Sequence, residues 1–242
     1  MRASPFLTVG VLGGMGPEAT AYFLDLIIRN TAAAKDQEHV PVMVYSLPQI
    51  PHRTDAILHG GRSPLPMLRH GAGILARAGA DFLIMPCLTA HYFLPGLAAA
   101  SPVPFVDLVE ETAVRLRAFR PRIRRVGLLA TTGTIESRLF HDAFERSGTT
   151  VLTPSGRDLR RLMTAIYGKG GIKSGVITGR PRDVVIAVAA ELVRKGAQAI
   201  VAGCTEIPLV LKASDLPVPL IDPMRIGARV CIRKAGGALR SP

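Results

Sequence analysis

Aromatic residues and cysteines are scarce in this chain of 242 residues, which has no Trp, four Tyr, eight Phe and three Cys. Sites for single-stranded nucleic acid stack bases on aromatic side chains, and the sequence also lacks zinc-ligand spacing and a helix-turn-helix pattern. We therefore expect no nucleic-acid partner. An odd number of widely spaced cysteines argues against a disulfide framework and favours free thiols.

Long hydrophobic runs are absent as well. No uninterrupted apolar run approaches the roughly 20 residues of a membrane-spanning helix. Phe6–Leu12 is too short for the apolar part of a secretory signal, and it leads into a glycine turn, which indicates a first core strand. The composition, 48% hydrophobic and 20% charged, is typical of a globular protein with a large core. We expect a cytoplasmic protein with no membrane partner.

Negative charge is outweighed by positive charge, since 30 Lys and Arg against 18 Asp and Glu give a formal net charge of +12. Such a charge can attract nucleic acid or an anionic membrane. The arginines are scattered, however, and their densest cluster lies between Arg115 and Arg125. We interpret the charge as a solvated surface with some preference for small acidic ligands.

Short β-branched runs alternate with amphipathic segments rich in Ala, Leu and Arg, a pattern typical of βαβ units. It predicts an α/β protein whose mainly parallel sheets are covered by helices on both faces. The expected strands are 8–12, 41–46, 82–85, 105–106, 125–130, 149–152, 199–202 and 219–221. The expected helices are 18–33, 64–78, 108–119, 135–147, 159–167, 182–195 and 225–235.

The sequence contains an internal duplication in which two strands, a turn and a cysteine recur 117 residues later. The aligned pairs are 79–87 with 196–204, 9–12 with 126–129, Gly16 with Gly133 and, at an offset of 115, 102–107 with 217–222. This repeat predicts two similar halves. We expect residues 1–105 plus 218–242 to form the first and residues 106–217 the second, with the last strand and helix crossing back to the first half.

Each copy of the repeat places one cysteine after a buried strand, Cys87 in the first and Cys204 in the second. Open α/β sheets bind ligands at the carboxyl ends of their strands, and the positive end of a following helix would lower the pKa of such a thiol. Opposed thiols in a shared cleft suggest proton transfer on both faces of one carbon. Inert buried thiols are the alternative, and it is the interpretation we keep for Cys231, which lies in an apolar helical pattern.

Two glycine-rich segments flank this chemistry. Gly13–Ala19 follows a strand and opens a helix, so its backbone N–H groups predict an anion-binding turn. It also fits a loose dinucleotide fingerprint, but the second strand ends Val44–Leu47 and lacks the acidic residue that would hold a ribose. Gly168–Gly175 has four glycines in eight residues, which predicts a mobile loop beside the cleft.

Four motifs resemble those of the aspartate/glutamate racemase family, the cofactor-independent two-cysteine amino-acid racemases. They are the opening motif Gly13–Thr20, the first cysteine motif Pro86–His91, the central turn Ala130–Thr134 and the second cysteine motif Gly203–Leu209. The resemblance implies two pseudo-symmetric Rossmann-like subdomains with the active site in the cleft between them, usually in a homodimer. It also implies no cofactor, with one thiolate removing the α-proton while the other thiol returns one from the opposite face.

The resemblance and the chemistry of these motifs together give the candidate site. Cys87 and Cys204 are the catalytic pair, and we expect no metal site. The substrate-binding candidates are Gly14, Met15, Arg53, Leu88, Thr89, Thr131, Thr132, Thr134, Lys173, Thr205 and Glu206.

Several of these residues carry specific expectations. Arg53 matches a family arginine that pairs with the distal carboxylate of the substrate, and Lys173 resembles the lysine beside that carboxylate, with Lys169 as the alternative. Glu206 could orient Cys204 or the substrate ammonium, or simply cap a helix. We expect His91 to be structural rather than catalytic, although it could tune Cys87. Asp107 and Asp222 occupy equivalent repeat positions, which suggests paired structural roles.

One position departs from the family pattern. The family commonly has Asn directly after the first cysteine, where its amide helps to hold the amino acid, and this chain has Leu88. The resemblance therefore implies racemisation of an acidic amino acid, aspartate first and glutamate second. A related racemase, isomerase or decarboxylase acting on another carboxylate is the alternative, and a non-catalytic binding protein for small ligands is the second.

Overall fold

The computed structural model describes residues 4–241, which form two parallel four-stranded sheets flanked by helices. The first sheet has the order β2-β1-β3-β4 and the second β6-β5-β7-β8, so the same order recurs four strands later. The strands are β1 (Val9–Gly13), β2 (Val42–Ser46), β3 (Phe82–Ile84), β4 (Phe105–Val106), β5 (Arg125–Leu129), β6 (Thr150–Leu152), β7 (Ile200–Ala202) and β8 (Leu220–Ile221). The α/β fold with parallel sheets is therefore confirmed.

The duplication extends to the pairing register. Gly10 pairs with Leu83 in the first sheet, and their counterparts 117 residues later, Gly127 and Ile200, pair in the second. Both glycines are needed for close approach, because a Cβ would lie 2.4 Å from Leu83 Cδ2 at the first and 2.7 Å from Ile200 Cδ1 at the second. The repeat thus preserves the packing of two neighbouring strands as well as their sequence.

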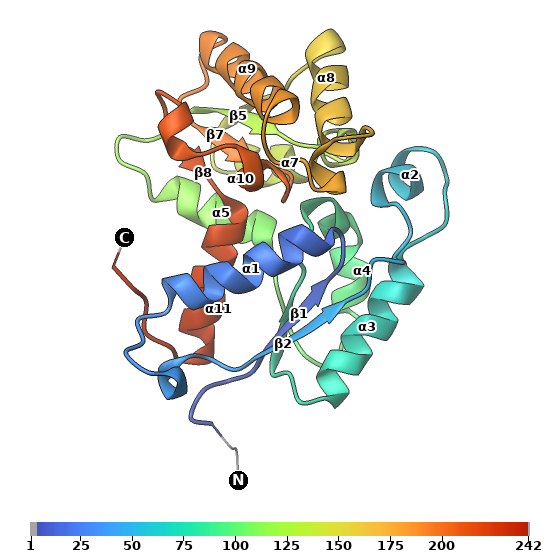
Figure 1. Ribbon diagram of the computed structural model, residues 1–242, viewed down its shortest axis with the longest axis vertical. Coiled ribbons are helices and arrows are strands. Elements are labelled where there is room, and N and C mark those ends of the chain that lie inside the picture. Colours follow the sequence, from blue (N-terminus) through green and yellow to red (C-terminus); the bar gives the residue numbers. More distant parts are fainter. Residues whose placement is uncertain (1–3, 242) are drawn as a thin grey trace.

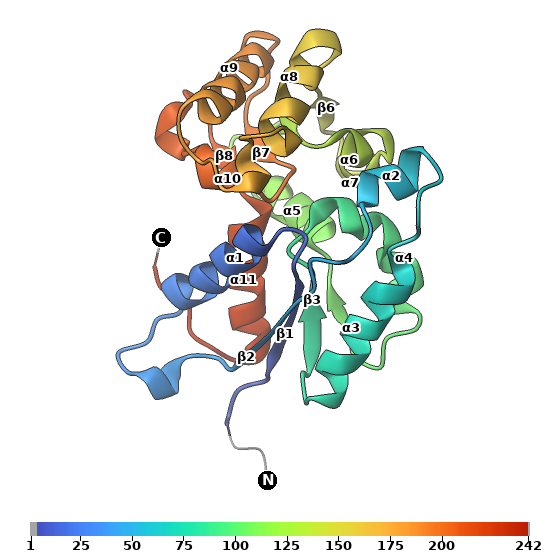
Figure 2. The same ribbon diagram turned by 45° about the vertical axis from the view of Figure 1, so that its right-hand side comes forward.

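Helices cover both sheets, and the half that carries α8 and α9 lies above the half that carries α1, α3 and α11 (Figures 1 and 2). The longer helices are α1 (Pro17–Asn30), α3 (Leu65–Arg77), α5 (Leu108–Arg117), α7 (Leu139–Glu145), α8 (Gly156–Tyr167), α9 (Arg180–Arg194) and α11 (Pro223–Ala235). The short ones are α2 (Arg53–Leu58), α4 (Leu94–Ala98), α6 (Thr132–Glu136) and α10 (Ile207–Val210). Among the described residues no helix has the length and apolar character of a membrane span.

The last strand does not return to the first half, so that expectation was wrong. Leu220 and Ile221 pair with Ile200 and Val201 of β7, in the second sheet. The last helix, α11, packs both on α1 of the expected first half and on α5, which the expected boundaries place in the second half. The proposed boundaries of the two halves otherwise stay a prediction, and one apolar cluster contains residues of both sheets, such as Val11 and Val126.

The equivalent aspartates start equivalent helices, which confirms their structural role. Asp107 accepts hydrogen bonds from the backbone N–H groups of Val109 and Glu110, at 2.8 and 3.2 Å, and so caps α5. Asp222 accepts one from Met224 N–H at 2.9 Å and caps α11. A carboxylate at a helix N-terminus satisfies otherwise unpaired N–H groups and opposes the positive end of the helix dipole.

The helix expected over 135–147 is interrupted. It consists of α6 and α7, and the break falls at Arg138, which has φ 57° in the left-handed region. The guanidinium of Arg138 forms exposed ion pairs with Asp142 and Glu145, at 3.2 and 3.0 Å, which contribute little. A continuous helix also allows contacts four and seven residues apart, so this spacing gives no sequence signal for the break.

Candidate active site

The two repeat cysteines meet at one small cavity at the carboxyl ends of β3 and β7. Cys87 and Cys204 are each 5% exposed, and both line a space of about 10 Å³. Eight further residues line it: Met15, Arg53, Leu88, Thr89, Tyr167, Lys173, Thr205 and Glu206. The structure thus brings together both expected catalytic cysteines and seven of the expected binding residues, whose contact with a substrate remains a prediction.

The Cys204 thiol donates a hydrogen bond to a buried carboxylate. Its Sγ lies 2.9 Å from Oε2 of Glu206, whose Oε1 forms an ion pair with the Lys173 ammonium. Burial and then the Glu206 charge raise the pKa of Cys204 well above its usual value, although the Lys173 cation acts in the opposite sense. The expected lowering of the pKa of this thiol is therefore wrong, because α10 starts only at Ile207 and has a single turn.

The buried Glu206 and the partly buried Lys173 form an ion pair across two loops. Burial lowers the pKa of Lys173, but the Glu206 and Cys204 charges outweigh it, so the pKa of the ammonium is raised. Lys173 Nζ also lies 3.4 Å from the Met15 carbonyl oxygen. The lysine thus ties the turn after β1 to the second cysteine motif, and Lys169 is placed elsewhere, in an exposed position.

Cys87 has a different environment. Among the residues that the structure describes, its thiol has no hydrogen-bond partner, and no carboxylate bonds to it. Its backbone carbonyl accepts a hydrogen bond from His91 Nδ1 at 3.0 Å, while His91 Nε2 accepts one from Leu108 N–H at 3.1 Å. Burial lowers the pKa of His91, which keeps the ring neutral, as these two contacts require. His91 therefore holds the cysteine loop against the start of α5.

Arg53 reaches the cavity from the first residue of α2. Its guanidinium donates to the carbonyl oxygens of Ile50 and Pro51, at 3.1 and 3.0 Å, and to that of Met15 at 3.4 Å. Its Nε is buried and has no hydrogen-bond partner among the described residues. A buried donor without a partner costs free energy, so this N–H is suited to an anionic ligand group.

Three threonine hydroxyls form a buried triangle behind the cavity. Thr89 Oγ1 lies 3.1 Å from Thr131 Oγ1 and 2.9 Å from Thr134 Oγ1, and the last two lie 3.2 Å apart. Thr131 also caps α6 by accepting from Thr134 N–H. The triangle joins the first cysteine motif to the central turn, so Thr131 and Thr134 position Thr89.

Two expected binding residues have structural partners. Gly14 has φ +93°, and a Cβ there would lie 2.4 Å from Leu47 N, while its N–H donates to Thr20 Oγ1 at 2.8 Å. Its glycine is thus required by the turn itself. The Thr132 N–H points to the sulfur of Met163 at 3.4 Å, on α8.

Tyr167 is the cavity residue that sequence reasoning missed. It ends α8, its ring lies 5.0 Å from that of His52, and Lys173 Nζ lies 5.5 Å from the ring centroid. Burial, followed by the charges of Cys204, Cys87 and Glu206, raises the pKa of its hydroxyl, so the phenol stays protonated. The only sequence signal was its place directly before the glycine-rich loop.

The cavity is closed around its thiols. A space of about 10 Å³ holds roughly one water molecule, far below the roughly 300 Å³ at which ligand pockets begin. An amino acid can enter only if the surrounding segments open. Arg53 and Lys173 both lie on short segments, α2 and the turn at Ile172–Ser174, that close the site. Within residues 4–241 no three His, Cys, Asp or Glu side chains are grouped as metal ligands.

Comparison with known proteins gives consistent relatives. The sequence profile of Asp/Glu/hydantoin racemases matches residues 12–231. The broad specificity amino-acid racemase RacX of Bacillus subtilis is 26% identical over 220 residues, which cover 88% of this chain and 92% of RacX. A glutamate racemase of Pseudomonas entomophila is 31% identical over 189 residues, 74% of this chain and 68% of its own. The structure of Picrophilus torridus aspartate racemase superposes with a TM-score of 0.87 at 28% identity, covering 97% of this chain and 96% of that one.

Proposed function

The chain belongs to the Asp/Glu/hydantoin racemase family, and from this premise we propose that it racemises an acidic amino acid, aspartate before glutamate, without a cofactor. The observation that carries the proposal is the pair of buried thiols lining one cavity, which Arg53, with its buried and unpaired Nε, also lines. RacX, the Pseudomonas entomophila enzyme and the Picrophilus torridus enzyme are amino-acid racemases, and this chain is an enzyme of that kind.

The hydrogen bond of Cys204 to Glu206 supports a protonated Cys204 thiol in the resting state. Because its thiol donates to Glu206, Cys204 carries a proton and is ready to act as the acid. We assign the role of base to Cys87, the other thiol of the cavity. A thiolate of Cys87 takes the α-proton and becomes a thiol, and Cys204 gives its proton to the opposite face of the carbanion and becomes a thiolate. The reverse sequence converts the other enantiomer.

The cations of the site support this chemistry. A carbanion next to a carboxylate needs fixed positive charge and hydrogen-bond donors to be stabilised. The buried and unpaired Nε of Arg53 supports a role in binding the distal carboxylate through a charge-assisted hydrogen bond. When Cys204 has lost its proton, Lys173 remains beside it as the compensating cation. We further propose that the protein is cytoplasmic and forms a homodimer. Size-exclusion chromatography with light scattering tests the homodimer.

Leu88 favours a second candidate substrate. Its side chain is 1% exposed and lines the cavity where the family commonly has an amide. An apolar wall at this point fits a substrate that still carries a carboxylate but is less polar than aspartate. The two candidates share the thiol chemistry and differ only in the substrate.

The test is α-proton exchange in D₂O, followed by proton NMR, with a panel of acidic and neutral L- and D-amino acids. We expect both enantiomers of aspartate to lose the α-proton signal fastest, glutamate next and neutral amino acids slowest. Exchange of a less polar amino acid at a higher kcat/KM than aspartate would establish the second candidate. No exchange with any substrate of the panel would refute racemisation.

A further inference from the structure

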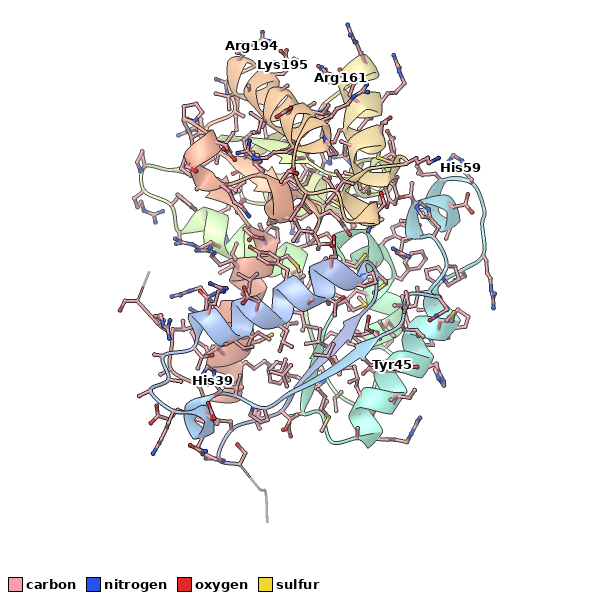
Figure 3. The ribbon with its side chains drawn as sticks, in the orientation of Figure 1. His39, Tyr45, His59, Arg161, Arg194 and Lys195 are labelled. Carbon is pink, nitrogen blue, oxygen red and sulfur yellow. The ribbon has the colours of Figure 1, made fainter. Side chains whose placement is uncertain are left out.

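A second cavity lies between α8 and α9, away from the thiols. It has a volume of about 570 Å³, and five cationic side chains line it, those of Arg157, Arg160, Arg161, Lys169 and Arg180. Arg161 lies on α8, at the end of the molecule opposite the first sheet (Figure 3). We call this cavity the basic groove. The charge of the groove is more one-sided than that of the whole chain, which has 18 acidic residues beside its 30 Lys and Arg. No carboxylate is among the residues that line the groove with the five cations.

Most of these cations form no ion pair with another residue that the structure describes. Arg161 pairs with Asp158 at 3.3 Å, with side chains 41% and 30% exposed, an interaction that contributes little. Within residues 4–241, Arg157, Arg160, Lys169 and Arg180 form no ion pair. Like charges gathered without counter-charges repel one another, so an anion that binds among them relieves that repulsion.

We propose that the basic groove binds a small ligand carrying two or more phosphate groups. A guanidinium group can bind two oxygens of one phosphate at once. One such group is enough for a single carboxylate, so several arginines around one cavity favour a ligand with more than one phosphate. The volume is that of a site for a nucleotide-sized molecule. The apolar part of the lining consists of Ala165, Pro181 and Val184, and no aromatic ring lines the groove for a base to stack on. Recognition therefore rests on the phosphates.

The groove and the active site share one segment of chain. Tyr167 of the thiol cavity ends α8, Lys169 and Gly170 line the groove, and Lys173 returns to the thiol cavity. A ligand that binds Lys169 therefore restrains a segment four residues from the partner of Glu206. We expect occupation of the groove to change the KM of the proposed racemase, a consequence that, unlike binding itself, rests on the proposed function.

Isothermal titration calorimetry of the whole chain at physiological salt tests the binding. The probes are inorganic triphosphate, adenosine triphosphate, sulfate and a short DNA duplex. We expect both triphosphates to bind in the micromolar range and sulfate to bind far more weakly. Equal affinity for the two triphosphates means that phosphate alone is recognised, and tighter nucleotide binding means that the nucleoside adds contacts. Tighter binding of the duplex than of either triphosphate would overturn the proposal.

Matched variants separate the groove from the general positive charge. Arg160→Gln/Arg180→Gln should weaken triphosphate binding about tenfold or more, because two charge-assisted contacts are lost. Arg62→Gln/Arg77→Gln removes the same charge from two exposed positions of the first half and should change the affinity less than about twofold. Hydrogen exchange of residues 168–175 should slow on binding in the wild type. Equal weakening in both double variants, or no calorimetric binding by either triphosphate, would overturn the site whether or not the chain racemises aspartate.

Discussion

The two copies of the strand-and-cysteine unit share a backbone and differ in the residues beside the thiol. Strands β3 and β7 pair with β1 and β5 in the same register and deliver Cys87 and Cys204 to one cavity. The next two positions differ, since Leu88 and Thr89 in the first copy correspond to Thr205 and Glu206 in the second. As a result one thiol donates to a buried carboxylate and the other does not.

This comparison shows that the position of a thiol and its protonation state depend on different residues. Position depends on strand register and on glycines that permit close strand packing, and the repeat preserves both. Protonation depends on one or two neighbouring side chains, which changed in one copy without moving the strand. In the mechanism that we propose, two symmetrically placed thiols with unequal electrostatics start as the acid and the base.

The largest expected effect comes from removing either thiol. Cys87→Ser and Cys204→Ser should each lower the racemisation rate of aspartate by about 10³-fold or more. A serine hydroxyl is a much weaker acid than a thiol, so it does not lose its proton and cannot act as the base. Chiral chromatography of the products measures the rate, and circular dichroism checks the fold. Cys231→Ala is the matched control, since Cys231 is buried among apolar residues of α11, and it should keep activity. Turnover at the wild-type rate in either serine variant would contradict the two-base mechanism.

Arg53 should discriminate between acidic and neutral substrates. Arg53→Ala removes the buried Nε donor, so kcat/KM for aspartate should fall roughly 10- to 150-fold, which corresponds to about 1.5–3 kcal/mol, the range for a hydrogen bond to a charged group. Neutral amino acids, measured side by side, should lose little. Equal losses for both classes would show that Arg53 supports the loop rather than the distal carboxylate.

Glu206→Gln should make the two thiols more alike. The substitution removes the negative charge beside Cys204 and leaves Lys173 as an unpaired cation, so the pKa of Cys204 should fall. Weakening a charge-assisted hydrogen bond should also cost about tenfold in kcat/KM. Alkylation of each cysteine against pH, followed by mass spectrometry, measures the shift, and equal 5% exposure makes Cys87 the internal control. An unchanged alkylation profile of Cys204 would mean that Glu206 does not set its proton.

Leu88→Asn tests the other changed position. It should supply the missing hydrogen bond and raise kcat/KM for aspartate roughly five- to tenfold, about 1 to 1.4 kcal/mol. Because Leu88 packs in the apolar core, the amide should also lower the free energy of unfolding by about 1–3 kcal/mol. Leu88→Met keeps the volume and apolar character and should leave aspartate turnover unchanged. Poor aspartate turnover in both the wild type and Leu88→Asn would favour the less polar substrate.

The sequence predicted most of the fold because the signals were local and repeated. All eight strands were expected, since β-branched runs bounded by turns recur at a fixed offset. The partner sheet of β8 was missed, although the repeat aligns 217–222 with 102–107, the segment that contains β4, and β8 pairs with β7 as β4 pairs with β3. So was the break at Arg138, because arginine is not a residue type that marks a left-handed conformation. Motifs located the cysteines, Arg53 and Lys173, whereas Tyr167 enters the site only through the path of α8.

The most direct test follows α-proton exchange in D₂O for each enantiomer of aspartate separately, with wild type, Cys87→Ser and Cys204→Ser. A variant that keeps one base can still remove the α-proton on that side. The account predicts that the wild type exchanges both enantiomers, that each variant exchanges only one, and that the two variants exchange opposite ones. Exchange of both enantiomers by a single variant, or of the same enantiomer by both, would contradict the two opposed thiols.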